Sequence, residues 1–376
     1  MKIIITTGGT GGHINPALAV AAEMKKRHPD AGILFVGAKG KMEEKLVPAA
    51  GFRLETIDSS GFQRSLSPQN IKRNVGAVIN LLKSAGQSKK IIKGFNPDLV
   101  VGFGAYVSGP VVRAAAKMGI KTAIHEQNAF PGITNKALAK MVDVVMLASS
   151  DAEKHITSKN KPIVTGLPIR EEILNADRDF SRAELKLDGR PLIFSVGGSL
   201  GARKINEAVI ALISELYKED KYNFIHGYGQ YGKWVPEKLR ENGIDPENSP
   251  GLRVTEYIYD MDKALSAADL VINRAGAATL TEIAAIGAAS ILIPSPNVTE
   301  NHQYHNAMAL VKQNAAYIIE EKDLTPEILI KKAKELLADP ENLKKTGQNA
   351  KNMAITDATS KICDILDKFI IMNYAL

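Results

Sequence analysis

The sequence predicts an α/β protein with two Rossmann-like domains, each built on a parallel sheet. Short apolar segments alternate with stretches of helical spacing along all 376 residues, and this alternation is typical of strand–helix–strand crossovers. The candidate strands are more numerous than one doubly wound sheet ordinarily holds. A glycine-rich loop follows the first strand, and a similar loop follows a strand that begins at residue 191. The pattern therefore starts again in the second half.

Each half of the chain carries its own series of candidate strands. In the first half they are residues 2–6, 33–37, 54–57, 98–102, 121–125, 143–147 and 162–165. In the second half they are residues 191–196, 222–226, 252–255, 270–273, 290–293 and 316–319. Strands such as Leu99–Val101 and Ile291–Ile293 are apolar on both faces, as strands inside a parallel sheet must be.

The break between the two series lies near Thr165–Pro168. It predicts an N-terminal domain of residues 1–166 and a C-terminal domain of residues 167–354. The tail from about residue 340 to 372 is predicted to be helical, with no strand after it. Further segments with helical spacing are residues 16–26, 71–92, 203–217 and 303–312.

Composition excludes several classes of protein. Hydrophobic residues make up 45% of the chain and charged residues 24%, which is ordinary for a folded protein and excludes a disordered one. Cys363 is the only cysteine, so a disulfide framework is excluded and a reducing compartment is expected. We expect no transmembrane helix, because no apolar stretch reaches the necessary length of about 18 residues. Residues 1–5 read as a first strand rather than a secretion signal.

The net charge of +7 is unevenly distributed. Residues 1–167 hold 23 basic and 11 acidic side chains, whereas the rest of the chain has an acidic excess. Residues 61–95 contain no acidic residue. Their basic residues are Arg64, Lys72, Arg73, Lys83, Lys89, Lys90 and Lys93. We therefore expect the first half to meet an anionic partner.

The first glycine loop, GGTGGH at residues 8–13, lies between a strand and a helix. Its glycines let the backbone approach a ligand, and the helix N-terminus favours an anion or a cluster of hydroxyls. The loop is neither a P-loop nor a dinucleotide fingerprint, since Ile14 stands where that fingerprint needs glycine. A tight turn without a ligand is the alternative. His13 is a candidate general base, with a structural histidine as the alternative.

Two further clusters follow strands in the first half. Residues 102–110 contain three glycines between a strand and a predicted helix, and the tetrapeptide HEQN occupies residues 125–128. Consecutive polar residues at the carboxyl end of a strand suit a site that fixes hydroxyls or an amide. A polar loop that caps the next helix is the alternative.

The second half offers its own candidate phosphate site. Residues 197–201 form a glycine loop with Ser199, suited to phosphate binding through backbone N–H groups. Glu282 lies in the first turns of the helix after residues 274–276, where a carboxylate can accept from ribose hydroxyls or simply favour the helix dipole. The triplet Asp260–Asp262 is interpreted as a helix cap rather than a metal site.

Together these segments resemble the bacterial peptidoglycan N-acetylglucosaminyltransferases of glycosyltransferase family 28, which transfer GlcNAc from UDP-GlcNAc to lipid I and so make lipid II. The shared segments are GGTGGHINPALAVA, YVSGP, HEQN, PGITNKALAK, GGSLGAR, TEYIYDM, RAGAATLTE and NHQYHNA. They run in family order from residue 7 to about 309. The resemblance implies a GT-B architecture with two Rossmann-like domains facing a deep cleft. It also implies a C-terminal helix, residues 355–376, that returns to the N-terminal domain.

The resemblance implies where each substrate binds. On the UDP-GlcNAc side it implicates Thr10, Gly11, Gly12, Asn128, Arg170, Ser199, Ile258, Ala277, Ala278, Thr279, Glu282 and Gln303. On the acceptor and lipid side it implicates Gly104, Tyr106, Ser108, Lys72, Arg73, Lys89 and Lys90. Asn128 and Gln303 would bind the sugar, Arg170 and Ser199 the nucleotide and its phosphates, and Glu282 the ribose. Ile258 would contact uracil through its backbone, and Ala277–Thr279 would place a helix start under the diphosphate.

Three positions depart from the family pattern. Leu167, Ala105 and Leu200 stand where Gly-Asn-Pro, a glycine pair and glutamine, respectively, are usual. Each changes a local contact near the hinge, the acceptor or the phosphates, and none changes the family assignment.

The implied reaction is an inverting displacement, in which the C4 hydroxyl of the MurNAc unit attacks the anomeric carbon and UDP leaves. His13 is the first candidate for the base that takes the hydroxyl proton, and Glu126 is the second. The helix N-termini would stabilise UDP. We expect no tightly bound cofactor and no metal site in the protein, with a divalent cation at most stimulating the reaction.

The basic stretch 61–95 is interpreted as a surface for anionic lipid headgroups on the cytoplasmic face of the membrane. Its apolar face would come from Val78, Ile79, Leu81, Leu82, Ile91 and Ile92. The alternative is a solvated helix whose apolar side belongs to the core. The enzyme would be a peripheral membrane protein of the last cytoplasmic step in peptidoglycan precursor synthesis, and so of cell-wall biogenesis, cell shape and division.

The sequence alone leaves two alternative functions open. One is another GT-B enzyme that uses a UDP-sugar, such as a glycolipid glucosyltransferase or a UDP-GlcNAc epimerase. The other is a nucleic-acid-binding protein, which the basic stretch suggests but no recognition motif supports. The oligomeric state is not predicted.

Overall fold

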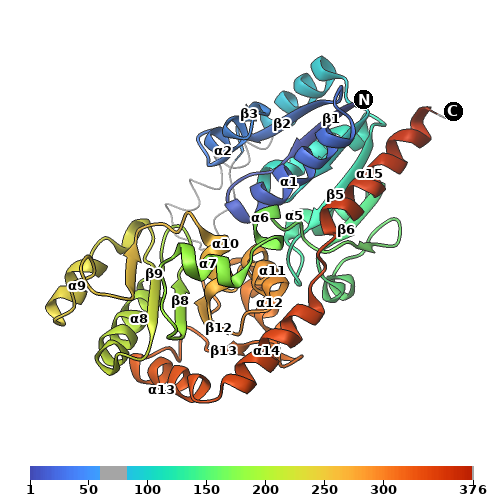
Figure 1. The fold of residues 1–376 in the computed structure, drawn as a ribbon. Helices are drawn as coiled ribbons and strands as arrows, with labels where there is room; N and C mark the ends of the chain where they lie inside the picture. The colour runs from blue at the N-terminus through green and yellow to red at the C-terminus, as the bar shows by residue number, and fades with distance from the viewer. Residues whose placement is uncertain (60–82, 375–376) are drawn as a thin grey trace. The chain divides into compact units, whose positions relative to one another are not determined.

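The computed structural model describes residues 1–59 and 83–374. The chain divides into two compact units, here called unit 1 (Met1–Ile169 and Ile355–Leu376) and unit 2 (Arg170–Ala354). Each unit contains one wholly parallel sheet with helices on its faces (Figure 1). Both are Rossmann-like, which confirms the predicted fold class.

The sheet of unit 1 has the strand order β3-β2-β1-β4-β5-β6-β7. Its strands are β1 (Lys2–Thr6), β2 (Gly32–Ala38), β3 (Arg53–Ile57), β4 (Leu99–Gly102), β5 (Lys121–Glu126), β6 (Val144–Leu147) and β7 (Ile163–Val164). The chain order reverses between β1 and β4, which are hydrogen-bonded neighbours. Ligands of open α/β sheets bind at such a reversal, outside the carboxyl ends of the strands.

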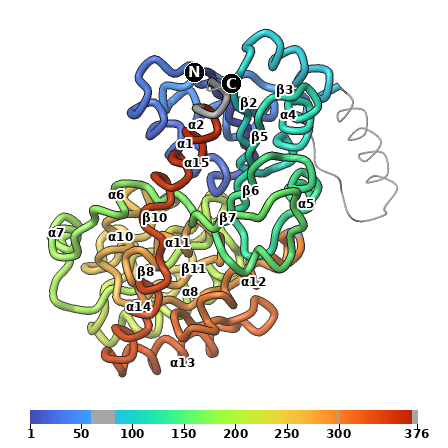
Figure 2. The backbone as a smooth tube through the Cα atoms, turned by 90° about the vertical axis from the view of Figure 1, so that its right-hand side faces the viewer, coloured from blue at the N-terminus to red at the C-terminus, as the bar shows by residue number. Residues whose placement is uncertain are grey.

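Helices cover both faces of this sheet. They are α1 (Gly11–Arg27), α2 (Glu43–Ala49), α4 (Ala105–Lys117), α5 (Ile133–Ala139), the 3₁₀ helix η1 (Ser150–His155) and α15 (Ala358–Tyr374). The last helix lies beside α1 in both views (Figures 1 and 2). It contributes Ile362, Cys363, Leu366 and Ile370 to the same core as β1 and α1. The C-terminal helix therefore completes the N-terminal unit, as predicted.

Residues 83–95 are helical. Their burial shows whether the apolar side of this part of the basic stretch faces the core or is free for a membrane. Lys83, Lys89, Lys90 and Lys93 are exposed. Ile92 is only 1% exposed and lies in the core beside β2 and α4. The prediction that Ile92 belongs to a membrane-facing apolar surface is therefore wrong, because this side of the helix packs against the sheet. Arg64, Lys72, Arg73 and the residues from Val78 to Leu82 lie outside the described residues.

The sheet of unit 2 has the order β10-β9-β8-β11-β12-β13. Its strands are β8 (Leu192–Val196), β9 (Asn223–Gly227), β10 (Leu252–Thr255), β11 (Leu270–Asn273), β12 (Ser290–Leu292) and β13 (Tyr317–Ile318). The order reverses between β8 and β11. This is the point at which the second glycine loop and the segment before Glu282 leave the sheet.

The helices of unit 2 are α6 (Glu171–Leu174), α7 (Arg178–Glu184), α8 (Arg203–Leu216), α9 (Val235–Glu241), α10 (Met261–Ala267), α11 (Ala277–Ile286), α12 (His302–Val311), α13 (Pro326–Leu337) and α14 (Pro340–Met353). Residues of α8 and α13 pack with residues of the sheet in one large apolar cluster. Short 3₁₀ turns lie at Tyr217–Glu219, Gln230–Gly232 and Thr299–Asn301. The predicted tail helix is two helices, α14 and α15, with a break between Met353 and Ala358.

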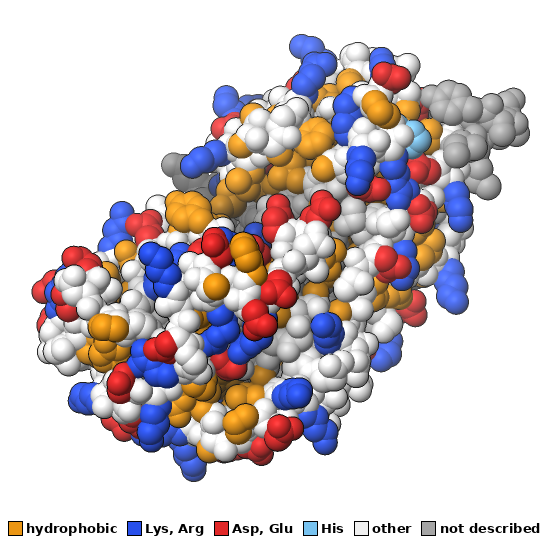
Figure 3. Space-filling model, viewed as in Figure 1, with side chains coloured by type: hydrophobic (Ala, Val, Ile, Leu, Met, Phe, Trp, Pro, Cys, Tyr) orange, Lys and Arg blue, Asp and Glu red, His pale blue; other side chains and the backbone are white. Residues whose placement is uncertain are grey.

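The described helices include none with the length and apolar character that crossing a bilayer requires. On the face drawn in Figure 3, acidic and basic side chains are interspersed over unit 2.

Candidate active site

Apart from the four basic residues of the stretch 61–95, the predicted site residues lie in loops and helix starts that follow the carboxyl ends of strands; Lys89 and Lys90 lie on the helix before β4. In unit 1 the glycine loop follows β1, residues 103–106 follow β4 and residues 127–132 follow β5. These three strands are neighbours in the sheet, so their loops meet at one edge. In unit 2 the corresponding loops follow β8, β10, β11 and β12.

The first glycine loop is held in place by a buried carboxylate that the sequence analysis did not identify. Glu43, at the start of α2, is fully buried and accepts hydrogen bonds from the N–H groups of Ala38 (2.8 Å) and Gly9 (3.1 Å). A Cβ on Gly8 would lie 2.2 Å from its Oε1. Gly8 is therefore needed to admit the carboxylate rather than to admit a ligand. An acidic residue at the start of a helix is too common to reveal this role from sequence.

The second half of the glycine loop, residues 10–13, is accessible to a ligand. Thr10 is the N-cap of α1 with extended backbone, and it is exposed. Gly11, Gly12 and His13 form the first turn of α1 and are half-buried. This helix end lacks an acidic residue in its first turn, so its N–H groups favour an anionic or hydroxyl-rich ligand.

The loop after β4 contains Ala105, one of the three positions that depart from the family pattern. Gly104 and Ala105 have φ of +83° and +61°, the left-handed region that costs an alanine about 1–2 kcal/mol. The usual glycine pair is thus explained by backbone conformation at both positions. Tyr106 is 51% exposed and remains available to a ligand.

Ser108 lies in a different environment from Tyr106. It is fully buried, and its hydroxyl donates to backbone carbonyls of Thr6 (3.1 Å) and Gly104. It therefore connects α4 to β1. This geometry argues against the predicted direct contact of Ser108 with the acceptor.

His13 faces Gln127, with 2.9 Å between its Nδ1 and the Oε1 of Gln127. His125, two residues before Gln127, is fully buried and stacks on Phe103. Its Nε2 donates to the carbonyl of Gly166 at 2.9 Å, and burial lowers its pKa to about 4. His125 is therefore neutral at physiological pH and holds the segment after β7.

Glu126 is 2% exposed, and donors surround both of its oxygens. Oε1 accepts from the backbone N–H (2.9 Å) and the side-chain Nδ2 (3.0 Å) of Asn128. Oε2 accepts from the N–H of Gly132 (3.1 Å) and from Nδ2 of Asn135 (2.8 Å). A carboxylate in this position shapes the loop and orients Asn128. This geometry argues against Glu126 as the base.

In unit 2, Arg170 and Glu282 form an ion pair, with 2.8 Å between Nε and Oε1. Glu282 is 9% exposed. Burial raises its pKa, and the Arg170 guanidinium opposes that shift. Both residues belong to the predicted nucleotide site. The half-buried residues Ala277–Thr279 begin α11 one to two turns before Glu282.

The second glycine loop packs on the loop after β9. The N–H of Gln230 donates to the carbonyl of Ser199 at 3.1 Å, and a Cβ on Gly201 would lie 2.2 Å from the carbonyl oxygen of Tyr228. Ser199 and Leu200 are exposed. The departure at Leu200 therefore places an apolar side chain, 51% exposed, at the rim of the loop.

The remaining predicted residues of unit 2 lie on the same sheet edge. Ile258 is 3% exposed, with its side chain against Gly227. Oε1 of Gln303 accepts from the N–H of Ser295 at 2.9 Å, which leaves its amide N–H groups for another acceptor.

Asp260 occupies the N-cap position of α10 and forms a two-point ion pair with Arg253, at 2.7 Å for each N–O contact. Asp260 therefore stands where a helix cap was predicted, but its side chain makes no capping hydrogen bond because both oxygens pair with Arg253. Within residues 1–59 and 83–374, no cluster of three or more His, Cys, Asp and Glu side chains is positioned to hold a metal.

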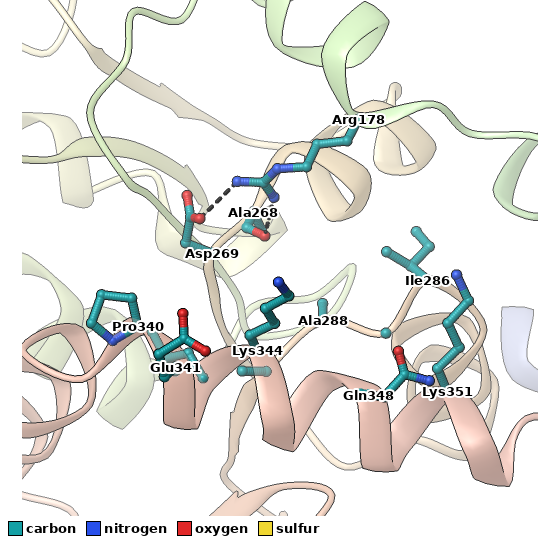
Figure 4. A pocket seen from close by; sticks show the side chains of 13 residues that line it. Arg178, Ala268, Asp269, Ile286, Ala288, Pro340, Glu341, Lys344, Gln348 and Lys351 are labelled. Atoms are coloured by element: carbon teal, nitrogen blue, oxygen red, sulfur yellow. Dashed lines mark hydrogen bonds and ion pairs between the residues drawn. The ribbon is translucent and has the colours of Figure 1, made fainter.

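One cavity of about 470 Å³ lies in unit 2 away from these loops. Figure 4 shows Arg178 pairing with Asp269 above α14, whose Lys344, Gln348 and Lys351 side chains line the opposite wall. Asp269 precedes β11, so the cavity lies at the amino ends of the strands. It contains none of the predicted site residues.

Comparison with known proteins identifies the family. Residues 3–147 match the glycosyltransferase family 28 N-terminal domain, and residues 192–362 match the family 28 C-terminal domain. The chain belongs to glycosyltransferase family 28. A family member from Acetivibrio thermocellus is 45% identical over 100% of both chains. It is named UDP-N-acetylglucosamine--N-acetylmuramyl-(pentapeptide) pyrophosphoryl-undecaprenol N-acetylglucosamine transferase.

One solved structure agrees with the family 28 assignment, and another shares only the fold. The crystal structure of MurG from Acinetobacter baumannii matches with a TM-score of 0.78 and 31% identity, covering 98% of this chain and 99% of the other. A UDP-GlcNAc 2-epimerase from Neisseria meningitidis matches with a TM-score of 0.66 and 13% identity, covering 98% and 100%. The second match shows only the shared GT-B fold.

Proposed function

We propose that this family 28 glycosyltransferase transfers GlcNAc from UDP-GlcNAc to the C4 hydroxyl of the MurNAc unit of lipid I, giving lipid II and UDP. The observation that carries the proposal is the 45% identity, over the full length of both chains, to the Acetivibrio thermocellus enzyme whose name states this reaction. The segments that implied the reaction from sequence lie at the carboxyl edges of the two sheets.

Unit 2 binds the nucleotide in this proposal. The carboxylate of Glu282 has Oε2 left for the ribose hydroxyls, because the hydrogen bond from Arg170 goes to Oε1. The N-termini of α8 and α11 direct backbone N–H groups to the diphosphate and spread its charge as UDP leaves. Gln303 binds GlcNAc hydroxyls, and the backbone at Ile258 binds uracil.

Unit 1 binds the acceptor and supplies the base. The acceptor oxygen forms its bond to the anomeric carbon while the bond from that carbon to the UDP oxygen breaks, and the electron pair leaves with UDP. His13 takes the hydroxyl proton, since Glu126 is occupied by loop donors and His125 is fully buried with its Nε2 bonded to the Gly166 carbonyl. Inversion at the anomeric carbon gives a β-1,4 link.

No tightly bound cofactor and no protein-held metal take part in the proposed reaction. The support is that Asp260, the first carboxylate of the D-x-D triplet, is already paired with Arg253. If the proposal is right, activity persists in excess chelator, and an added divalent cation at most stimulates it.

The lipid acceptor places the enzyme at the cytoplasmic face of the membrane as a peripheral protein, where peptidoglycan precursors for wall growth and division are made. Support comes from the exposed lysines Lys83, Lys89, Lys90 and Lys93 on one helix of unit 1. Each would contribute about 1 kcal/mol near an anionic surface. Co-sedimentation with anionic and neutral vesicles tests this, and equal binding to both contradicts it.

The transfer itself is tested with radiolabelled UDP-GlcNAc and a lipid I analogue. The expected product is labelled lipid II, with UDP-Glc and UDP-GalNAc competing poorly. Conversion of UDP-GlcNAc without acceptor would instead indicate an epimerase, and labelling of a diacylglycerol would indicate a glycolipid transferase. Either result contradicts the proposal.

A further inference from the structure

We propose that Gln127 is a positioning residue that fixes which ring nitrogen of His13 carries the proton. The inference rests on the proposed function only in naming His13 as the base. The contacts themselves are set by unit 1. Gln127 follows β5 and is 4% exposed, so its amide is surrounded by protein.

The orientation of the Gln127 amide follows from its neighbours. Its Nε2 donates to the carbonyl oxygens of Phe103 (2.9 Å) and His125 (3.3 Å). Its Oε1 lies on the other side, 2.9 Å from Nδ1 of His13. Turning the amide over would place Oε1 against two carbonyl oxygens and remove the Gln127 donor from both, although the His125 carbonyl also accepts from Nδ2 of Asn135 (3.3 Å). The buried carbonyls therefore hold Oε1 toward the imidazole.

The tautomer of His13 follows from this orientation. A carbonyl oxygen only accepts, so Nδ1 must carry the hydrogen, and the neutral imidazole then has its lone pair on Nε2. Within the described part of the chain, no hydrogen bond occupies Nε2. When Nε2 takes the proton of the acceptor hydroxyl, the O–H bond breaks and an Nε2–H bond forms. The imidazolium keeps its Nδ1–H bond to Gln127 throughout.

Gly104 keeps the two side chains together. A Cβ at this position would lie 2.9 Å from Nδ1 of His13 and 3.2 Å from Oε1 of Gln127. With φ of +83°, the backbone also disfavours a side chain. The glycine of the second loop therefore leaves room for the histidine of the first loop to reach the glutamine of the third.

The test is ¹⁵N NMR of histidine-labelled protein, in which coupling patterns show which ring nitrogen carries hydrogen. Spectra are taken at about pH 9, well above the ordinary imidazole pKa of about 6.5. His13→Asn assigns the signals. Gln127→Met removes the amide at similar size, whereas Gln127→Glu keeps an acceptor toward Nδ1 and loses the donors. Gln348→Met, on an exposed part of α14, is the matched control.

The expected result is the Nδ1–H tautomer in the wild type, Gln127→Glu and the control, and a mixed or Nε2–H tautomer in Gln127→Met. A wild-type spectrum with Nε2–H overturns the inference without any variant. An unchanged spectrum in folded Gln127→Met also overturns it. If lipid II is not formed but the tautomers behave as expected, the proposed function fails and the positioning role stands.

Kinetics give an independent readout. Gln127→Met is expected to lower kcat by about 10- to 100-fold, part of the 10²–10⁴-fold that a general base contributes, with KM for UDP-GlcNAc nearly unchanged. A rise in KM at constant kcat would mean that Gln127 contacts the donor instead, and it would overturn the inference.

Discussion

Glu126 in unit 1 and Glu282 in unit 2 are both buried carboxylates near the carboxyl edges of their sheets. They differ in the number of hydrogen bonds that they accept. Glu126 accepts four hydrogen bonds from Asn128, Gly132 and Asn135. Among the residues that the structure describes, Glu282 accepts one side-chain hydrogen bond, from Arg170. Burial raises the pKa of Glu282.

The difference separates a structural carboxylate from a binding one. A carboxylate that is satisfied on both oxygens is stable in its charged form and has little capacity left for a substrate proton. A carboxylate buried with too few donors is held at a cost that a ligand with hydroxyl groups can relieve. We therefore infer that Glu126 shapes its loop, and the proposed contact of Glu282 with the ribose stays a prediction, although both were candidates for chemistry in the sequence.

The largest expected effect is that of Glu126→Gln on stability. The new amide turns an N–H group toward donors of the loop, and we expect a loss of roughly 2–4 kcal/mol in the unfolding free energy. Urea unfolding followed by circular dichroism measures it. Glu44→Gln is the control, since this exposed carboxylate accepts one bond from the Gly40 N–H. Unchanged stability with a large drop in kcat would restore Glu126 as the base.

The next effect concerns Glu282→Gln and nucleotide affinity. Loss of charge-assisted bonds to the ribose should weaken UDP binding by about 10- to 100-fold, which calorimetry measures. The wild type should discriminate against 2′-deoxy-UDP, and the variant should bind both nucleotides with similar affinity. Discrimination that survives in the variant would place the ribose elsewhere. Glu241→Gln, on the exposed end of α9, serves as the control.

A smaller effect is expected in the pH dependence of UDP binding. Protonated Glu282 cannot accept from both hydroxyls, so affinity falls as the pH drops through its raised pKa. Arg170 opposes that rise. In Arg170→Met the acid loss of affinity should therefore begin at higher pH than in the wild type. Titrations of UDP at several pH values measure this, and an unchanged midpoint would remove Arg170 from the control of Glu282.

The smallest expected effect is on how the free energy of unfolding depends on pH. The test is whether Glu282→Gln becomes more or less stable relative to the wild type as the pH rises. Because the folded pKa of Glu282 is raised, its contribution to stability is fully present below the ordinary value of 4.5 and is lost as the pH rises through the folded pKa. Glu282→Gln lacks this loss. The variant should gain stability relative to the wild type between acidic and neutral pH in urea unfolding, and a relative decrease would contradict the assignment.

The sequence predicted the two parallel sheets and the positions of the loops because these depend on local signals. Apolar runs give the strands, and glycines before helix starts give the loops. Glu282 was singled out from its depth in α11, since a helix fixes that depth, and its role as a ribose ligand stays a prediction. The comparison with relatives confirms the family that these segments indicated.

Other roles depended on contacts between distant residues. Ser108 and Tyr106 are two positions apart, yet one is buried and the other exposed, because α4 turns only one of them toward β1. Glu43 reaches Gly9 across 34 positions, and Gln127 reaches His13 across 114. Ile92 faces the core for the same kind of reason. No local pattern reveals such pairings.

The last helix has a consequence for synthesis. Ile362, Cys363, Leu366 and Ile370 of α15 fill the core that β1 and α1 begin, so one core is built from two segments that the whole of unit 2 separates in the chain. Unit 2, a continuous segment between them, can fold while unit 1 still lacks its final helix. Unit 1 is therefore expected to complete its core only after unit 2 and α15 have been synthesised. Until then, the part of α1 that packs on α15 lacks its apolar partner.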